Sequence, residues 1–331
     1  MNRNDAKGAD PGNRERGFTC RILSLFLSIP LGILAPRPLA LSQSGPPPDP
    51  ELNSAEEQMS AFEKALQADR SDANARKSEV DTAVQLSLAE RRENREQAAL
   101  WLLLRAQYWV PDDPRLLVDL GVQEDNLKLF ADADKTLTEA LKIRPNDLNT
   151  LYTVARVKMD LGQMQSAEQA WLSYIKQDPS NPTAYYGYGL VLQTLGRDDE
   201  ARLQFNRSIE ENPNQAESYY RLGEIARRGG NKAAARSEYE RALARDSRHG
   251  GALTGLAILD YEEKKYGSAE SELEAAIKSE PEYRTTRYYH GLTLARLGRK
   301  KEAEAEFSRA VQLSEETKQQ RQLVPQPYRP N

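Results

Sequence analysis

The chain has almost none of the residues that supply metal and redox chemistry. Its 331 residues include one cysteine, Cys20, and two histidines, His249 and His290. Neither histidine has a second histidine or a cysteine at the spacing of a zinc motif, so we expect no metal site and no cofactor. A single cysteine forms no disulfide within the chain, which is compatible with an envelope compartment without proving one.

Strand patterns and aromatic residues are also scarce. No regular alternation of apolar and polar residues marks a strand. Aromatic residues make up 7% of the chain and charged residues 29%, and the mean hydropathy is −0.75. This composition favours a solvated, all-helical array over a compact enzyme. Acidic residues occur in clusters that also contain basic residues. We interpret these clusters as the solvated faces of helices rather than as catalytic pairs. One such cluster is Glu270, Glu272, Glu274 and Lys278.

Alanine, by contrast, recurs at a fixed interval between residues 133 and 303. Each of these alanines lies 34 residues from the next, without an insertion. They are Ala133, Ala167, Ala201, Ala235, Ala269 and Ala303. A period of this length fits two short antiparallel helices with their turns, so it predicts a stacked helical array. Stacked arrays bind other molecules along a long face.

Other positions repeat with the same period. If the alanine is position 20, the units begin at Pro114, Leu148, Pro182, Ala216, Gly250 and Arg284, and the last ends near Thr317. Position 8 is small and reads Gly121, Ala155, Gly189, Gly223, Ala257 and Gly291. Position 24 is large and apolar and reads Leu137, Trp171, Phe205, Tyr239, Leu273 and Phe307.

Each repeated position has a physical role. Small residues at positions 8 and 20 let the two helices of a unit approach closely, and large residues at position 24 fill the space between helices. Glycine at position 15 closes the first helix in the left-handed conformation. Proline at position 32 stops the second helix, and the Asp and Asn residues that follow it cap the next one. The glycines are Gly162, Gly196, Gly230 and Gly298, and the prolines are Pro145, Pro179, Pro213 and Pro281.

The pattern resembles the tetratricopeptide repeat family over six contiguous units, residues 114–317. The resemblance implies an all-α fold, an α-solenoid of helix–turn–helix repeats wound as a right-handed superhelix. In this family the first helices line the concave surface, and positions 2, 5, 9 and 12 point into it. We therefore expect a protein that binds a protein or peptide and is not an enzyme.

Two further segments precede the six repeats. Residues 73–113 form a degenerate repeat, because Ala99, Leu103 and Pro111 fit positions 20, 24 and 32 while Ser87 replaces the usual residue of position 8. Residues 51–72 form an N-terminal capping helix or half repeat, which a capping box at Ser54 is expected to open. At the other end we expect residues 318–331 to be a disordered tail.

The N-terminal 42 residues do not fit the array. Basic residues precede an apolar run from Ile22 to Ala35, and Ala40–Leu41–Ser42 follows as a small-x-small pattern. This layout is typical of a secretory signal peptide cleaved after Ser42, with a Pro-rich linker at 43–50. The alternative is an uncleaved anchor, with residues 22–41 in an inner membrane. The sequence thus predicts export to the periplasm or cell envelope.

The net charge of the chain limits the class of molecule that it can bind. The net charge is −4, and residues 1–42 carry six basic and three acidic side chains, so the mature chain has a net charge of −7. This excess of acidic residues argues against nucleic acid as the main partner. A membrane would be contacted only through an uncleaved N-terminal segment.

Tyrosine is concentrated at position 5 of the repeats. That position reads Val118, Tyr152, Tyr186, Tyr220, Thr254 and Tyr288. Tyrosine offers a rigid apolar surface and one hydroxyl group, and it is enriched at recognition sites. Arg156 and Glu224 occupy position 9 and Arg221 position 6, so these charges complete a ladder for an extended ligand. The alternative is that the tyrosines pack against neighbouring helices, as Tyr185 and Tyr219 at position 4 are expected to do.

A second functional class is assembly through the ends of the solenoid. No amphipathic helix follows the last unit to cover the helix that carries Ala303, Phe307 and Ala310. A second copy of the chain would supply that cover. The chain would then act as an envelope assembly subunit that self-associates through its C-terminal end, with an uncleaved N-terminal segment as its membrane anchor.

Overall fold

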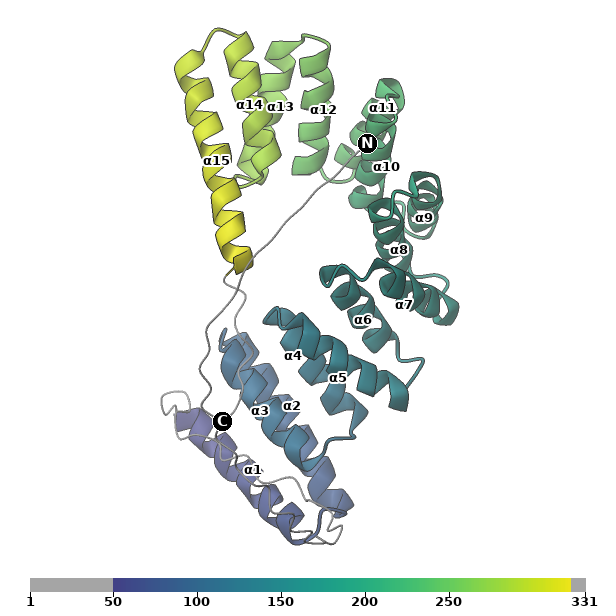
Figure 1. Ribbon diagram of the computed structural model, residues 1–331, viewed down its shortest axis with the longest axis vertical. Helices are drawn as coiled ribbons and strands as arrows, with labels where there is room; N and C mark the ends of the chain where they lie inside the picture. Colours follow the sequence, from purple (N-terminus) through teal and green to yellow (C-terminus); the bar gives the residue numbers. More distant parts are fainter. Residues whose placement is uncertain (1–49, 323–331) are drawn as a thin grey trace, which may run out of the picture. The chain divides into compact units, whose positions relative to one another are not determined.

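The computed structural model describes residues 50–322 as an array of helices (Figure 1). This part of the chain contains no strand, and none of its helices is long and apolar enough to cross a membrane. The predicted signal segment and most of the linker lie outside it. The helices are α1 (Pro50–Ala68), α2 (Ala73–Arg92), α3 (Glu96–Trp109), α4 (Pro114–Asn126), α5 (Phe130–Ile143), α6 (Leu148–Asp160), α7 (Met164–Gln177), α8 (Pro182–Thr194), α9 (Asp198–Glu211), α10 (Ala216–Arg228), α11 (Lys232–Leu243), α12 (Gly250–Glu262), α13 (Tyr266–Ser279), α14 (Arg284–Arg296) and α15 (Lys300–Gln322).

The helices pack in consecutive pairs, which confirms the predicted all-α solenoid. From α2·α3 to α14·α15, each pair makes its most extensive contacts internally, and each second helix also contacts the first helix of the next unit. Several first helices contact the first helix of the next unit as well, as α4 does α6 and α12 does α14. The six predicted unit starts are the first residues of α4, α6, α8, α10, α12 and α14.

The turn inside each repeat uses a left-handed residue at position 15. The four predicted glycines have φ between 72° and 84°. Where glycine is missing, Asn94, Lys128 and Lys264 adopt φ of 58°, 60° and 64° at the same position. In the turn at Gly162, the Gln163 backbone amide donates to the Lys158 carbonyl, which satisfies an acceptor at the end of α6. The turn geometry therefore persists where the sequence departs from the glycine pattern.

Asp and Asn side chains between the repeats cap α6 and α8 as predicted, whereas Gln215 and Tyr283 make no side-chain cap at α10 and α14. Asp113 and Asn181 each accept two backbone N–H groups at the starts of α4 and α8, and Asp147 accepts the Thr150 amide at 2.9 Å. His249 lies in the inter-repeat turn and caps α12, since its Nδ1 accepts the Ala252 amide at 3.2 Å. These bonds satisfy donors that a helix start would otherwise leave unpaired.

The large residue at position 24 fits against small residues of two repeats. A Cβ added at Gly189 would lie 2.6 Å from Phe205, so position 8 must stay small within the unit. A Cβ at Gly187, in position 6, would lie 2.3 Å from Trp171 of the preceding unit, and Gly255 meets Tyr239 in the same way. The repeat pattern did not predict this second contact, which joins one repeat to the next.

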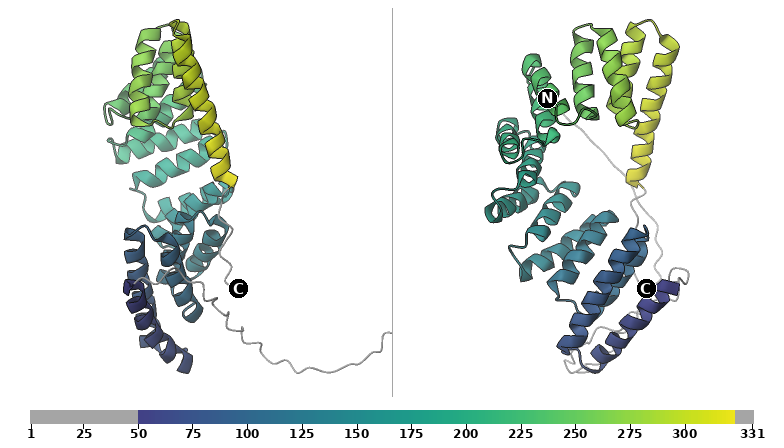
Figure 2. Two further views of the ribbon diagram at one scale, coloured as in Figure 1. Left: turned by 90° about the vertical axis from the view of Figure 1, so that its left-hand side faces the viewer. Right: turned by 180° about the vertical axis from the view of Figure 1, so that it is seen from behind.

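Both ends of the helical array extend further than the repeat pattern indicates. The helix α1 begins at Pro50 rather than at the predicted capping box, so Ser54 lies inside it, and α1 packs beside α2 (Figure 2). Proline is well suited to the first turn of a helix. At the other end α15 continues to Gln322, past the predicted end near Thr317. No proline or glycine interrupts the sequence before Pro325, so nothing stops the helix earlier.

Candidate functional site

The tyrosines of position 5 lie on first helices and pack against the aromatic ring at position 24 of their own repeat. The ring centroids are 5.5 Å apart for Tyr152–Trp171, 5.9 Å for Tyr186–Phe205, 6.2 Å for Tyr220–Tyr239 and 5.9 Å for Tyr288–Phe307. The first three tyrosines are half-buried, so each combines a packing contact with a partly accessible ring. By contrast, Tyr185 and Tyr219 at position 4 are buried, as predicted.

Three of the predicted residues meet where α8 faces α10. The Arg221 Nε donates to the Tyr186 hydroxyl at 3.4 Å, and the Arg221 guanidinium lies 5.1 Å from the centre of the Tyr220 ring. The Tyr186 hydroxyl in turn donates to Glu217 Oε2 at 3.4 Å. We call Tyr186, Glu217, Tyr220, Arg221 and His249 the central cluster.

Glu217 and His249 complete the central cluster, although the sequence analysis did not select them. His249 Nε2 lies 3.2 Å from Glu217 Oε1, and its ring centre lies 4.9 Å from that of Tyr220. The hydrogen bond from His249 holds the pKa of Glu217 below its ordinary value despite burial. Burial lowers the pKa of His249, but Glu217 outweighs that effect and raises it. Since Nδ1 accepts the Ala252 amide only when unprotonated, protonation of His249 would release the cap of α12.

Arg221 differs from most arginines of the array because no carboxylate pairs with its guanidinium at ion-pair distance among the described residues. A half-buried guanidinium with open donors is suited to a carboxylate of a ligand. Arg156 lies on α6, in the repeat that precedes the repeat of Tyr186. Its guanidinium lies 5.8 Å from the Tyr152 ring centre and 3.5 Å from Asp125, a carboxylate whose pKa burial raises.

The remaining two predicted residues lie elsewhere. Glu224 accepts the Tyr239 hydroxyl and pairs with Arg227 at 2.9 Å, so its carboxylate is engaged within its own repeat. Tyr288, on α14, is 49% exposed and lines a cavity formed by α14 and α15. Of the predicted ladder, Tyr186, Tyr220 and Arg221 thus meet in the central cluster, while Tyr152 with Arg156, Glu224 and Tyr288 lie apart from it.

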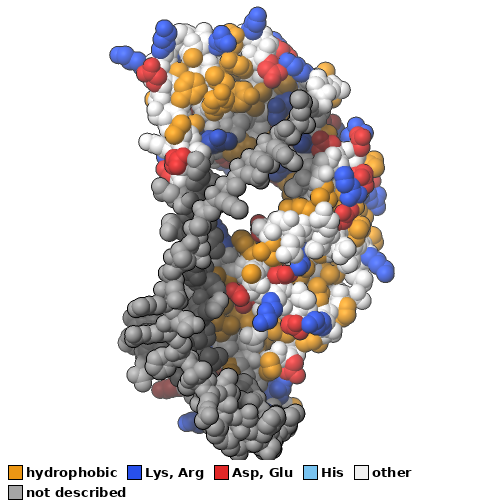
Figure 3. Space-filling view, viewed as in Figure 1, with side chains coloured by type: hydrophobic (Ala, Val, Ile, Leu, Met, Phe, Trp, Pro, Cys, Tyr) orange, Lys and Arg blue, Asp and Glu red, His pale blue; other side chains and the backbone are white. Residues whose placement is uncertain are grey.

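The open end of the last repeat has a cavity of its own. It has a volume of about 720 Å³. Val311, on the α15 side, is 63% exposed, a high value for a large apolar side chain. Hydrophobic side chains also gather at the top of the view in Figure 3, where the last repeats lie. The lining residues are Arg284, Thr285, Tyr288, Phe307, Ala310, Val311, Ser314 and Glu315.

One of the carboxylates assigned to a solvated face is instead half-buried. Glu272 Oε2 has no hydrogen-bond partner, and burial, with Asp260 nearby, raises the pKa of Glu272 to about 7. The interpretation of this cluster as a solvated surface is therefore wrong for Glu272. Its neighbour Glu274 is exposed, and Glu270 is intermediate.

Comparison with known proteins agrees with the repeat geometry. The family model described as tetratricopeptide repeat matches four overlapping segments, residues 152–216, 199–249, 220–267 and 254–316. The chain belongs to the tetratricopeptide repeat family. No curated protein matches it. Because the tetratricopeptide fold recurs with many functions, the family alone does not assign a ligand.

Solved structures resemble the array at low sequence identity. A tetratricopeptide repeat protein from Parabacteroides merdae is 18% identical, with a TM-score of 0.61, over 71% of this chain and 93% of that one. The pilF protein of Pseudomonas aeruginosa is 17% identical, with a TM-score of 0.52, over 58% and 88%. At these identities the likeness shows the tetratricopeptide solenoid fold alone.

Proposed function

We propose that this tetratricopeptide repeat protein is a non-enzymatic scaffold that binds an extended peptide segment along its first helices. The observation that carries the proposal is the central cluster, in which a half-buried arginine lies between two partly accessible tyrosines and has no carboxylate at ion-pair distance within residues 50–322. The rings provide apolar area at little entropic cost, and Arg221 provides charge. The ligand is therefore an extended segment with an acidic group.

Selection of peptides from a displayed random library, using the full chain as bait, tests this proposal. Peptides enriched on the wild type should carry an acidic residue and bind the Arg221→Met variant about 10–100-fold more weakly, because a desolvated charge pair is lost. Arg202→Met is a matched control, since Arg202 is exposed on the second helix α9 and pairs with Asp199. Equal affinity for the wild type and Arg221→Met would refute the assignment.

The proposed place of action is the periplasm or cell envelope. This rests on the basic, apolar and small-residue segments of residues 1–42. N-terminal sequencing of the protein recovered from a cell-envelope fraction tests the location. A chain that begins after Ser42 supports export with cleavage, and an intact chain in the envelope membranes supports the anchor. An intact chain confined to the cytosol contradicts both.

The cavity at the open end of α14 and α15 favours a second candidate function, assembly through the C-terminal end. Exposed Tyr288 and Val311 line it, and a second copy would remove them from water. Light scattering should then show a concentration-dependent increase in mass for the wild type. Val311→Glu should abolish this increase because it places a charge in the interface, whereas Leu203→Glu, at an equally exposed apolar residue of α9, should not. A strict monomer at high concentration excludes this function.

A further inference from the structure

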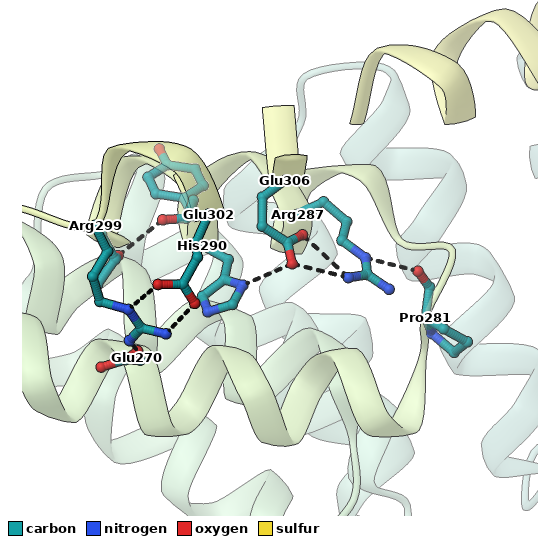
Figure 4. Close-up of polar contacts among 9 residues, drawn as sticks. Glu270, Pro281, Arg287, His290, Arg299, Glu302 and Glu306 are labelled. Carbon is teal, nitrogen blue, oxygen red and sulfur yellow. Dashed lines mark hydrogen bonds and ion pairs between the residues drawn. The ribbon is translucent and has the colours of Figure 1, made fainter. Parts of the chain in front are cut away.

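His290 is a buried histidine with unused hydrogen-bonding capacity. It lies on α14 with 8% of its surface exposed, and neither ring nitrogen has a hydrogen-bond partner in the part of the chain that the structure describes. The nearest charged group is Glu306 on α15, whose Oε1 lies 3.3 Å from Nδ1 (Figure 4). A buried imidazole without a partner is costly, so its surroundings call for an explanation.

Two carboxylates of the neighbouring helix face the same histidine. Glu270 and Glu274 are one turn apart on α13, so their side chains share a face. One oxygen from each, and one nitrogen of His290, all lie within 4.8 Å of one another. No sequence motif marks this group, because its two glutamates and its histidine come from different repeats and follow no fixed spacing in the chain.

The contact with Glu306 determines which nitrogen of His290 is available. Arg287 holds Glu306 in place through bonds of 3.2 and 3.1 Å to its two oxygens. A carboxylate beside Nδ1 favours the tautomer with its proton on that nitrogen, which leaves the lone pair of Nε2 free. Metal-binding histidines have this arrangement, in which a carboxylate orients the ring from its other nitrogen.

We propose that Glu270, Glu274 and His290 bind a zinc ion between α13 and α14. One imidazole nitrogen and two carboxylate oxygens are ligands that zinc accepts, and the fourth position would hold water. Ligand atoms that share a tetrahedral zinc are about 3.4 Å apart. Glu274 is exposed and therefore free to move inward by the required distance. Bound zinc would join the second helix of one repeat to the first helix of the next.

Arg299 is the group that opposes binding. Its guanidinium contacts Glu270 and also pairs with Glu302 through bonds of 2.7 and 2.5 Å. Zinc would have to displace Arg299 from Glu270, while the pair with Glu302 keeps the arginine partnered. Because Arg299 and zinc compete for the Glu270 carboxylate, removing the charge of Arg299 should tighten zinc binding.

Isothermal titration calorimetry of the full chain with zinc chloride tests the proposal. The absorption spectrum of the cobalt-loaded chain is the spectroscopic readout. We expect one zinc per chain, at least about tenfold weaker binding in Glu274→Gln, and a 10–100-fold loss in Glu306→Gln, which removes the orienting charge. Arg299→Gln should bind more tightly. Glu304→Gln is the control, since Glu304 is exposed on α15 and outside the group.

Because Glu274 is exposed, its variant is expected to fold even if a His290 variant does not. An absence of zinc uptake would overturn the proposal. Zinc that binds Glu274→Gln as tightly as the wild type would also overturn it, since the metal would then be held elsewhere in the chain.

Discussion

Replacing Gly187 with alanine is expected to destabilise the array by about 3 kcal/mol, as an overpacked core does. The added Cβ would lie 2.3 Å from Trp171 Cζ2 and 2.5 Å from Cε2. Trp171 is 2% exposed, so the ring has no open space into which it can move. Urea unfolding, monitored by circular dichroism, measures the loss.

Gly267→Ala is the matched control for that substitution. Gly267 also lies in a helix, but nothing lies within 4 Å of its added Cβ, so alanine should be neutral or stabilise by up to about 1 kcal/mol. The double variant Gly187→Ala/Trp171→Phe should be more stable than the two single effects predict, because the smaller ring makes room for the methyl group. If Gly187→Ala behaves like Gly267→Ala, the proposed contact between repeats is wrong.

Raising the pH from 5 to 9 is expected to destabilise the N-terminal end of the array through Glu79. This residue of α2 is fully buried, and among the described residues neither of its carboxylate oxygens has a hydrogen-bond partner. Burial, and then the charge of Glu63, raise the pKa of Glu79 to about 8, while Arg105 opposes the shift. The folded chain therefore holds a proton that the unfolded chain releases near pH 4.5, and stability falls as pH rises between these values.

The substitution Glu79→Gln separates this effect from other titrations. It removes the ionisation, so its stability relative to the wild type should rise by about 3 kcal/mol between pH 5 and pH 9. Urea unfolding at each pH measures the difference, and hydrogen exchange of α2 localises it. Glu93→Gln, at an exposed glutamate near the end of the same helix, should show no such trend. A difference between wild type and Glu79→Gln that does not change with pH would contradict the assignment.

The candidate binding residues could be located on helices from the sequence, but their partners could not. Counting from the alanine places Tyr186, Tyr220 and Arg221 on first helices, and the structure has them there. The count does not reveal that Arg221 bonds to Tyr186 of the preceding repeat or that His249 approaches Glu217. It also does not reveal that Glu224 is held by Tyr239 and Arg227 of its own repeat.

The sequence by itself determined the repeat length, the first residue of each first helix in the six units, the four left-handed glycine turns and the Asp and Asn caps of α6 and α8. These features depend on backbone geometry and on side chains a few residues apart, so a period of 34 residues is enough to specify them. Only the tertiary structure decided which side chains of adjacent repeats meet, as for Gly187 with Trp171 and His290 with Glu270. Such contacts depend on the offset and rotation between stacked units, to which every packed side chain contributes.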